Sequence, residues 1–268
     1  MLTLSPSAQR TLETALGCVD AFYAVMFRDW PGAVTRDVGD CTLSYSGGAH
    51  LTGANQVWPH TPDALKPAVL HEATRFFAPF RAAWSVILAD TYMPWGADFL
   101  ARRGYTLRWG SPLMALDGPA QSVPVRADSR AIRATTLDHL RDMGVIMAEA
   151  FGTEDAVNRR ITRPEHLNSP SVAHYLVYAG GAPASCATVT LCGETAGIWN
   201  VGTRHLFRRQ RYASTIMQAI LDDLAASGIA TSVLMASPSG QPLYERLGYQ
   251  SIGTMAYWAP PASRVGRA

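Results

Sequence analysis

The stretch of this chain that decides its fold runs from residue 196 to residue 228 and reads AGIWNVGTRHLFRRQRYASTIMQAILDDLAASG. Its first part, residues 196–203, predicts a β-strand. Its last part predicts a helix, because apolar residues recur at helical spacing along one face. These residues are Ala213, Ile216, Met217, Ile220, Leu221 and Leu224. Ser227 and Gly228 then predict the end of that helix.

A basic loop joins this predicted strand to this predicted helix. It contains Arg208, Arg209 and Arg211. The N–H groups of a first helical turn have no intrahelical acceptors, and the helix dipole favours negative charge beside them. The segment therefore predicts an anion site, for which a pyrophosphate is the natural ligand. The loop alone also fits an exposed arginine cluster on a solvated helix end.

The bulk composition describes a globular protein with enough apolar residues for a core. Hydrophobic residues make up 48% of the 268 residues and charged residues 16%, which excludes a disordered chain. The length fits one large domain or two of about 130 residues. The formal charge of +2 favours no particular partner and gives no support for extended nucleic-acid binding.

The cysteines and the chain ends indicate a soluble, cytoplasmic protein. The four cysteines (Cys18, Cys41, Cys186 and Cys192) form no C-x-x-C pair, and no histidine lies near one at metal-ligand spacing. We therefore expect reduced thiols and no metal site. The first 27 residues do not have the pattern of a signal peptide. No apolar run reaches the roughly 18 residues that span a bilayer, so we expect no membrane partner.

The chain divides into two halves with α/β patterning. A connector rich in proline and glycine runs from Asp117 to Pro124, and strand-like and helix-like segments alternate on both sides of it. Loop chemistry of this kind marks a domain boundary. We predict an N-terminal domain over residues 1–120 and a C-terminal domain over residues 121–268.

Both halves end in the same order of elements, which indicates an internal repeat. In the first half, the predicted strand 85–89 is followed by a helix that ends at Arg102-Arg103-Gly104-Tyr105 and by a strand to Leu116. In the second half, the predicted strand 232–236 is followed by a helix that ends at Arg246-Leu247-Gly248-Tyr249 and by a strand to Trp258. A glycine after each helix is a typical helix stop.

The second half resembles the GNAT superfamily of acyltransferases. The resemblance rests on Val201-Gly202-Thr203, Phe207-Arg208-Arg209-Gln210 and Tyr212-Ala213-Ser214, which are similar to the acyl-CoA-binding motif of that superfamily. A second signature follows at residues 236–249 (ASPSGQPLYERLGY), and residues 131–135 and 150–152 resemble the first strand and the end of the first helix. The match extends over nearly all of residues 130–260.

The resemblance implies a tandem GNAT-like fold of the α/β (α+β) class. Each half would be a mixed, mostly antiparallel sheet flanked by helices, and the N-terminal half would be a degenerate copy. The donor would be acetyl-CoA or another acyl-CoA. The residues that the resemblance assigns to its binding are Val201, Gly202, Thr203, Arg208, Arg209, Gln210, Arg211, Tyr212, Ala213, Ser214 and Ser237. Tyr244 would be the general acid that protonates the leaving thiolate.

The implied reaction is direct attack of an amine on the thioester carbonyl, with a backbone N–H of the Val201 strand holding the oxyanion. The general base stays open. Gly197 and Trp199 occupy positions where some family members carry glutamate or histidine, and neither can accept the proton. The other candidates are Glu149, Glu154, His166 and His174, alongside deprotonation through water or attack by an amine that is already neutral.

Two departures from the family pattern concern donor binding. Arg211 replaces the central glycine of the motif, where the backbone approaches the pyrophosphate closely. Its side chain could turn outward and pair with phosphate, close the site, or indicate a donor other than free CoA. In the first half, the helix expected from Asp63 to about Phe77 lacks an arginine-rich loop before it, and Leu100 stands where the second half has Tyr244. We expect no CoA site there, and a role in support, in shaping the acceptor pocket or in dimerisation.

The leading functional hypothesis is an N-acyltransferase, with acetyl as the expected group and a small-molecule or peptide amine as the acceptor. A transferase that takes its acyl group from tRNA or from a carrier protein is the second hypothesis. A binding module that has lost turnover is the third. We expect no nucleic-acid partner except tRNA as one of the two donors in the second hypothesis, and the sequence leaves a homodimer open.

Overall fold

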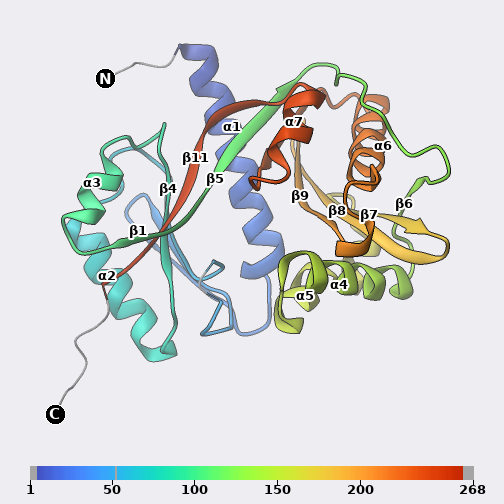
Figure 1. Ribbon diagram of the computed structural model, residues 1–268. Coiled ribbons are helices and arrows are strands. Elements are labelled where there is room, and N and C mark those ends of the chain that lie inside the picture. Colours follow the sequence, from blue (N-terminus) through green and yellow to red (C-terminus); the bar gives the residue numbers. More distant parts are fainter. Residues whose placement is uncertain (1–4, 52, 262–268) are drawn as a thin grey trace. The chain divides into compact units, whose positions relative to one another are not determined.

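The computed structural model describes residues 5–51 and 53–261 (Figure 1). Its elements alternate between helices and strands, as the sequence patterning predicts. Within these residues, no helix combines the length and the apolar character that crossing a membrane requires.

The chain forms two compact units, and each contains residues from both halves of the sequence. Unit 1 comprises the residues up to Phe22 and Met114–Ser251, and unit 2 comprises Tyr23–Leu113 and the residues from Ile252 onward. These units are defined by packing, whereas the predicted domains 1–120 and 121–268 are the two copies of a sequence repeat. The division into units therefore does not test the predicted domains, which stay a prediction.

Unit 1 holds the segment that decides the fold. Its helices are α1 (Pro6–Tyr23), α4 (Leu137–Phe151), α5 (Asp155–Ile161), α6 (Tyr212–Ala226) and α7 (Gln241–Leu247), with short helices η3 (Pro164–Asn168) and η4 (His205–Phe207). Its strands are β6 (Ala131–Arg133), β7 (Val172–Ala179), β8 (Ala182–Cys192), β9 (Thr195–Thr203) and β10 (Thr231–Met235). The strands β5 (Thr106–Asp117) and β11 (Gln250–Ala259) contribute residues to both units.

Unit 2 contains the remaining elements. Its strands are β1 (Val34–Val38), β2 (Cys41–Tyr45), β3 (Gln56–Pro59) and β4 (Ser85–Ala89). Its helices are α2 (Pro67–Phe77) and α3 (Gly96–Ala101), with η1 (Ala24–Arg28) and η2 (Ala78–Phe80). Helix α2 begins at Pro67, so the expected start at Asp63 is wrong. Proline fits the first helical position, and the extended backbone of Lys66 sets the helix boundary.

The two units repeat one strand-pairing scheme. In unit 1, β7 and β8 pair antiparallel, β8 and β9 pair antiparallel, and β9 and β10 pair parallel across helix α6. In unit 2, β1 to β4 repeat the same series, with α2 between the parallel strands. The predicted internal repeat and the mixed, mostly antiparallel sheet in each half are therefore confirmed.

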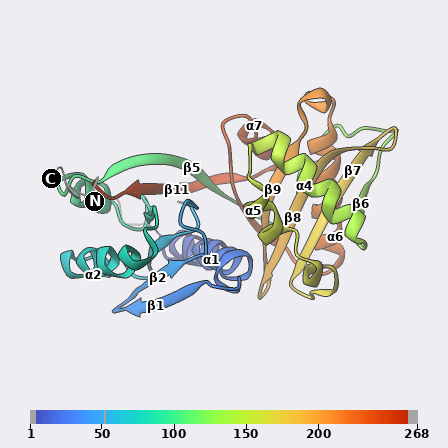
Figure 2. The ribbon, with the colours of Figure 1, turned by 90° about the horizontal axis from the view of Figure 1, so that it is seen from below.

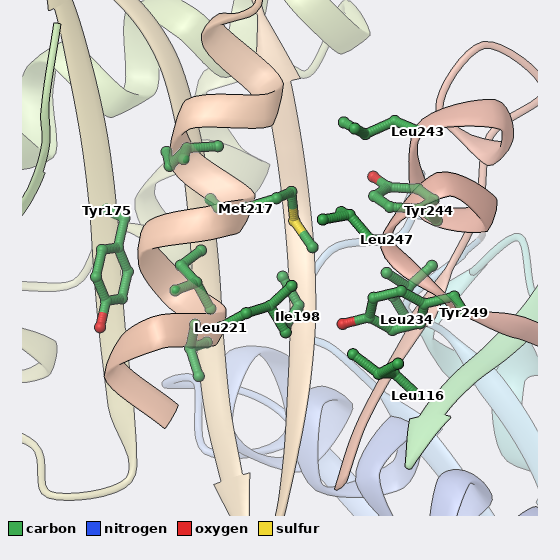
Figure 3. Packing of buried hydrophobic residues seen from close by; sticks show 14 of the residues in the cluster. Leu116, Tyr175, Ile198, Met217, Leu221, Leu234, Leu243, Tyr244, Leu247 and Tyr249 are labelled. Atoms are coloured by element: carbon green, nitrogen blue, oxygen red, sulfur yellow. The ribbon is translucent and has the colours of Figure 1, made fainter. Parts of the chain in front are cut away.

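Helices α4 and α6 lie on opposite faces of the β7–β9 sheet (Figures 1 and 2). The predicted apolar stripe of α6 faces the core, where Ile216, Met217 and Ile220 are fully buried. Burial of each such side chain contributes about 1.5–3 kcal/mol to folding. Figure 3 shows this stripe packing toward Ile198 of β9, with Leu247 of α7 beyond it. This core fixes where α6 begins relative to β9.

Candidate functional site

Strands β9 and β10 separate soon after they pair. Their parallel register runs from Thr195–Thr231 to Gly197–Val233, while β9 continues to Thr203. Within the described residues, the edge of β9 that faces β10 has no strand partner beyond Gly197. A free strand edge can pair with an extended ligand by β-augmentation. Val201, Gly202 and Thr203, which the sequence assigns to the donor, all lie on this part of β9.

A bulge interrupts β9 at Asn200. Thr188 pairs with Trp199 and Cys186 pairs with Gly202, so Asn200 and Val201 together lie opposite a single residue of β8. Asn200 has a φ of 55°, a left-handed conformation that asparagine adopts more readily than most residues. Bulges of this kind redirect backbone groups and are frequent beside active sites. The sequence does not predict this bulge.

The N-terminus of α6 presents a row of free backbone donors. Among the residues that the structure describes, the backbone N–H groups of residues 209–214 donate no hydrogen bond. The first N–H that donates at this helix end is that of Thr215, which lies 2.9 Å from the Arg211 carbonyl oxygen. Arg211 occupies the N-cap position without a side-chain cap. Serine or aspartate there would satisfy one of these N–H groups. The uncapped turn therefore suits an external anion.

The arginines of the loop divide into two groups. Arg208 is directed at backbone carbonyls, with Nε 3.2 Å from Thr203 O and an Nη 3.3 Å from Ala150 O. Arg209 and Arg211 are exposed, and neither side chain has a polar partner within the described part of the chain. These two side chains are free to meet an anion, whereas Arg208 secures the loop.

Arg126 is a further basic residue at this helix end, and the motif does not include it. Its guanidinium lies 4.8 Å from the ring centroid of Tyr212 and 3.4 Å from Gln210 Oε1. It also pairs with Asp128 at 2.6 Å, and its hydrogen bond lowers the pKa of Asp128. The segment that follows the predicted connector brings this arginine to α6 through a long-range contact, for which the sequence gives no signal.

Glu149 secures the turn that leads from β9 to α6. Its carboxylate lies 2.6 Å from Arg204 Nε and accepts the His205 N–H at 2.7 Å. The hydrogen bond from Arg204 lowers the pKa of Glu149. As a general base, Glu149 would be weak and already occupied, so the geometry assigns this candidate a structural role.

Tyr244 lies on α7 with its side chain almost completely buried at 6% exposure. Figure 3 shows its ring reaching from α7 toward Met217 of α6. Its hydroxyl makes no hydrogen bond to any of the residues that the structure describes. Burial raises the pKa of Tyr244 above its usual value, which keeps the phenol protonated at neutral pH. A protonated, unengaged hydroxyl is the form that a proton donor requires.

Ser237 lies close to this phenol. A Cβ atom added to Gly240 would lie 3.3 Å from both Tyr244 Oη and Ser237 Oγ. Ser237 accepts the Gly240 N–H at 3.2 Å, so its side chain helps to begin α7. The structure thus brings together two predicted residues that are seven positions apart in the sequence.

Bulky side chains cover the α4 face of β9. Phe151 lies over Gly202, where a Cβ atom would come within 2.8 Å of its ring. The indole of Trp199 covers Gly197 in the same way and donates to Thr190 Oγ1 at 2.8 Å. Phe22 of α1 packs on Trp199, with ring centroids 5.0 Å apart. Glycine at residues 197 and 202 is therefore required by packing.

The other candidate bases lie in different surroundings. Glu154 is an exposed residue at the start of α5. His166 and His174 are buried at 4% and 2% exposure, with their nitrogens 3.2 Å apart. None of them is free in the way that Tyr244 is.

The corresponding place in unit 2 lacks these features. Strands β3 and β4 also pair briefly, from Gln56–Ser85 to Val57–Val86. However, Leu100, which stands in the place of Tyr244, is fully buried in the apolar core of this unit together with Trp84. The structure shows no counterpart of the arginine loop before α2. The expectation that this half has no CoA site stays a prediction, consistent with this packing.

Comparison with known protein families also separates the C-terminal half of the chain from the N-terminal half. Residues 131–252 match the family model described as the acetyltransferase (GNAT) domain. The C-terminal half contains a GNAT domain. A GCN5-related N-acetyltransferase from Kribbella flavida is similar over 98% of both chains, at 18% identity and a TM-score of 0.74. No curated protein matches at the level of sequence.

The whole chain has a tandem GNAT fold. A tandem GNAT protein from the clavulanic acid biosynthesis pathway is similar over 96% of this chain and 95% of its own, at 14% identity and a TM-score of 0.64. A GCN5-related N-acetyltransferase from Sphaerobacter thermophilus covers 96% of this chain, at 12% identity and a TM-score of 0.62. At these identities the likeness is one of fold. The predicted GNAT resemblance is confirmed, and the assignments of individual site residues stay predictions.

Proposed function

We propose that the GNAT domain transfers an acyl group, with acetyl the expected one, from acyl-CoA to a primary amine. The observation that carries this proposal is the row of free N–H groups at residues 209–214 beside the unpaired edge of β9. Together they offer a pyrophosphate site and an edge for an extended arm, which are the two parts of CoA that a protein must hold.

The residues present fit such a donor. Arg209 and Arg211 add exposed positive charge to the helix N-terminus. The left-handed conformations of these two residues, with φ values of 62° and 67°, set the course of the loop at residues 209–211. Successive N–H groups in such a turn form a concave anion site.

The bulge and Tyr244 account for the chemical step. Attack of the amine nitrogen on the thioester carbonyl places negative charge on the carbonyl oxygen, and a backbone N–H beside Asn200 is the proposed donor to it. When the carbon–sulfur bond breaks, the electron pair goes to sulfur and Tyr244 supplies the proton. The amine proton leaves to water, because Gly197 and Trp199 cannot accept it and Glu149 is paired with Arg204.

The Tyr244→Phe variant tests this assignment. We expect kcat to fall by about 10²–10⁴-fold, as for loss of a general acid, while the Kd of acetyl-CoA stays within about twofold because the ring is retained. Single-turnover kinetics and calorimetric titration measure the two quantities.

Tyr249→Phe is the matched control. Tyr249 is equally buried, its ring centroid is 6.0 Å from that of Tyr244, and its hydroxyl bonds Ser232 at 2.6 Å. We expect it to lose about 1 kcal/mol of stability and to retain kcat. An unchanged kcat in Tyr244→Phe would remove Tyr244 as the acid.

The two alternative hypotheses, a binding module and a transferase with another acyl donor, predict different results with acetyl-CoA. A binding module would bind acetyl-CoA and transfer nothing to any amine in a broad screen. A transferase that uses acyl-tRNA or an acyl carrier protein would be active with that donor and inactive with acetyl-CoA. The amine acceptor itself is proposed here as a small molecule or a peptide, and a cytoplasmic location stays a prediction.

A further inference from the structure

A chain of buried polar side chains connects η3 to the bulge of β9. The Nδ1 atom of His166 on η3 lies 3.2 Å from the Nε2 atom of His174 on β7. His174 Nδ1 lies 3.1 Å from the Oγ1 of Thr188 on β8. Asn200 at the bulge completes the chain, because its Nδ2 lies 3.3 Å from the same Thr188 oxygen. His166, His174 and Thr188 are all buried.

The hydrogen-bond partners assign the proton positions on both rings. His166 Nδ1 also lies 2.8 Å from the carbonyl oxygen of Ile161. A carbonyl only accepts, so His166 Nδ1 carries a hydrogen, and His174 Nε2 beside it must accept. His174 therefore carries its hydrogen on Nδ1 and donates it to Thr188. His166 Nε2 accepts from Arg163 Nε at 3.4 Å, so both rings are neutral.

This arrangement makes His174 unsuited to act as the base. Both of its ring nitrogens are engaged, and the ring is 2% exposed. A proton arriving at Nε2 would face the hydrogen of His166, and the Nδ1 position is already protonated. The same engagement makes the ring a rigid support, since each partner is itself held in place.

Thr188 passes this support to the bulge. Its oxygen accepts from both His174 and Asn200, and the Cys186 thiol donates to the Asn200 carbonyl at 3.5 Å. The side chain and the carbonyl of Asn200 are thus both tied to β8. Because the orientation of the peptide groups around a left-handed residue depends on its φ and ψ, these ties fix where the neighbouring N–H groups point.

We propose that His174 and Thr188 are positioning residues that hold the Asn200 bulge in the geometry required for transfer. The proposal rests on the proposed function, since it concerns the backbone donor of that same site. His166 supports them by fixing the tautomer of His174. A misplacement of a reacting group by about 1 Å costs up to about 100-fold in rate, so the loss of this support has a measurable consequence.

The test uses Thr188→Val, which keeps the shape of the side chain and removes the hydroxyl. We expect amide hydrogen exchange at residues 200–202 to become about 10-fold faster and kcat to fall about 10-fold. The KM for acetyl-CoA should change by a smaller factor than kcat, because the proposed pyrophosphate site at residues 209–214 is not involved and only the proposed arm site along β9 is disturbed. Thr188→Ser restores the hydroxyl and should recover both quantities.

Thr190→Val is the matched control. Thr190 is on the same strand, is similarly buried and accepts the indole N–H of Trp199 at 2.8 Å. It should lose comparable stability while exchange at residues 200–202 stays as in the wild type. Wild-type exchange and kcat in Thr188→Val, or equal effects of the two valine variants, would overturn the proposal.

A second variant separates positioning from proton abstraction. Asparagine at residue 174 places an amide donor near the position of Nδ1. The pH profile of kcat/KM for His174→Asn should therefore keep the decrease at low pH that the wild type shows, which is its acidic limb. Loss of that limb would make His174 the base and overturn the positioning role. If the wild type transfers no acyl group to any amine, the proposed function fails, and hydrogen exchange at the bulge still decides whether Thr188 holds it.

Discussion

At the scale of single residues, Arg211 is the position at which the proposed donor site departs from the family motif. The sequence shows that an arginine replaces the central glycine of the family motif. The reason expected for that glycine is that the backbone approaches the pyrophosphate closely there. The structure adds a second reason, because Arg211 has a φ of 67° at the N-cap of α6. The sequence could not show this angle, since it depends on how the loop closes between β9 and α6. The exposed side chain leaves the row of N–H groups accessible.

Replacing Arg211 with glycine should raise the free energy of unfolding. A left-handed non-glycine residue costs about 1–2 kcal/mol, and the greater freedom of glycine in the unfolded chain returns about 0.5–1 kcal/mol of that. We therefore expect a net gain of about 0.5–1 kcal/mol in urea denaturation.

Arg209→Gly is the matched variant, because Arg209 is also exposed and has a φ of 62°. Each variant should weaken acetyl-CoA binding moderately through the loss of one charge. A loss of stability in both variants would mean that the loop is not strained as described.

At the scale of elements, the sequence predicts most of the site's framework. The strand expected at residues 196–203 is β9 (Thr195–Thr203), and the stripe from Ala213 to Leu224 is α6 (Tyr212–Ala226). Periodicity predicts these elements because α6 buries one face against the sheet. The bulge at Asn200 could not be predicted, because it depends on the register between β8 and β9. The link from His174 to Thr188 escapes prediction for the same reason, since these residues meet only across paired strands.

At the scale of the whole molecule, the sequence shows the internal repeat, but it does not show which residues belong to each compact unit. Gly104 and Gly248 follow equivalent helices in the turns that lead to the next strand, and both have positive φ, at 80° and 102°. Their shared chemistry is local, so sequence reasoning detects it. In contrast, β4 pairs with β11 from the end of the chain, and α1 belongs to unit 1. Such long-range pairings are set by packing that leaves no local pattern.

The buried histidines predict how global stability depends on pH. Burial lowers the pKa of His174 to about 3, with a smaller contribution from His166, against about 6.5 in the unfolded chain. Between these values the unfolded state binds the additional proton. Stability is therefore fully present above about pH 6.5 and falls as the pH decreases toward 3, by up to about 1.4 kcal/mol per pH unit.

The comparison of wild type with His174→Asn isolates this effect from other titrating groups. Burial also lowers the pKa of His166, which the Ile161 carbonyl and Glu165 raise and Arg163 lowers further. We expect the stability difference between the two proteins to shrink by about 2 kcal/mol from pH 7 to pH 5 in urea denaturation. A difference that stays constant over this range would show that His174 is not held neutral by the fold.

The most direct test of the central claim is a thermal-shift titration of the wild-type protein with acetyl-CoA, alongside CoA and pantetheine. A ligand that binds only the folded state at about 100 times its Kd stabilises it by about 2.7 kcal/mol. We predict a clear increase in Tm with acetyl-CoA and with CoA, and none with pantetheine at the same concentrations, because pantetheine lacks the phosphates that residues 209–214 would hold. No shift with either CoA species would contradict the assignment of this helix N-terminus as a CoA site.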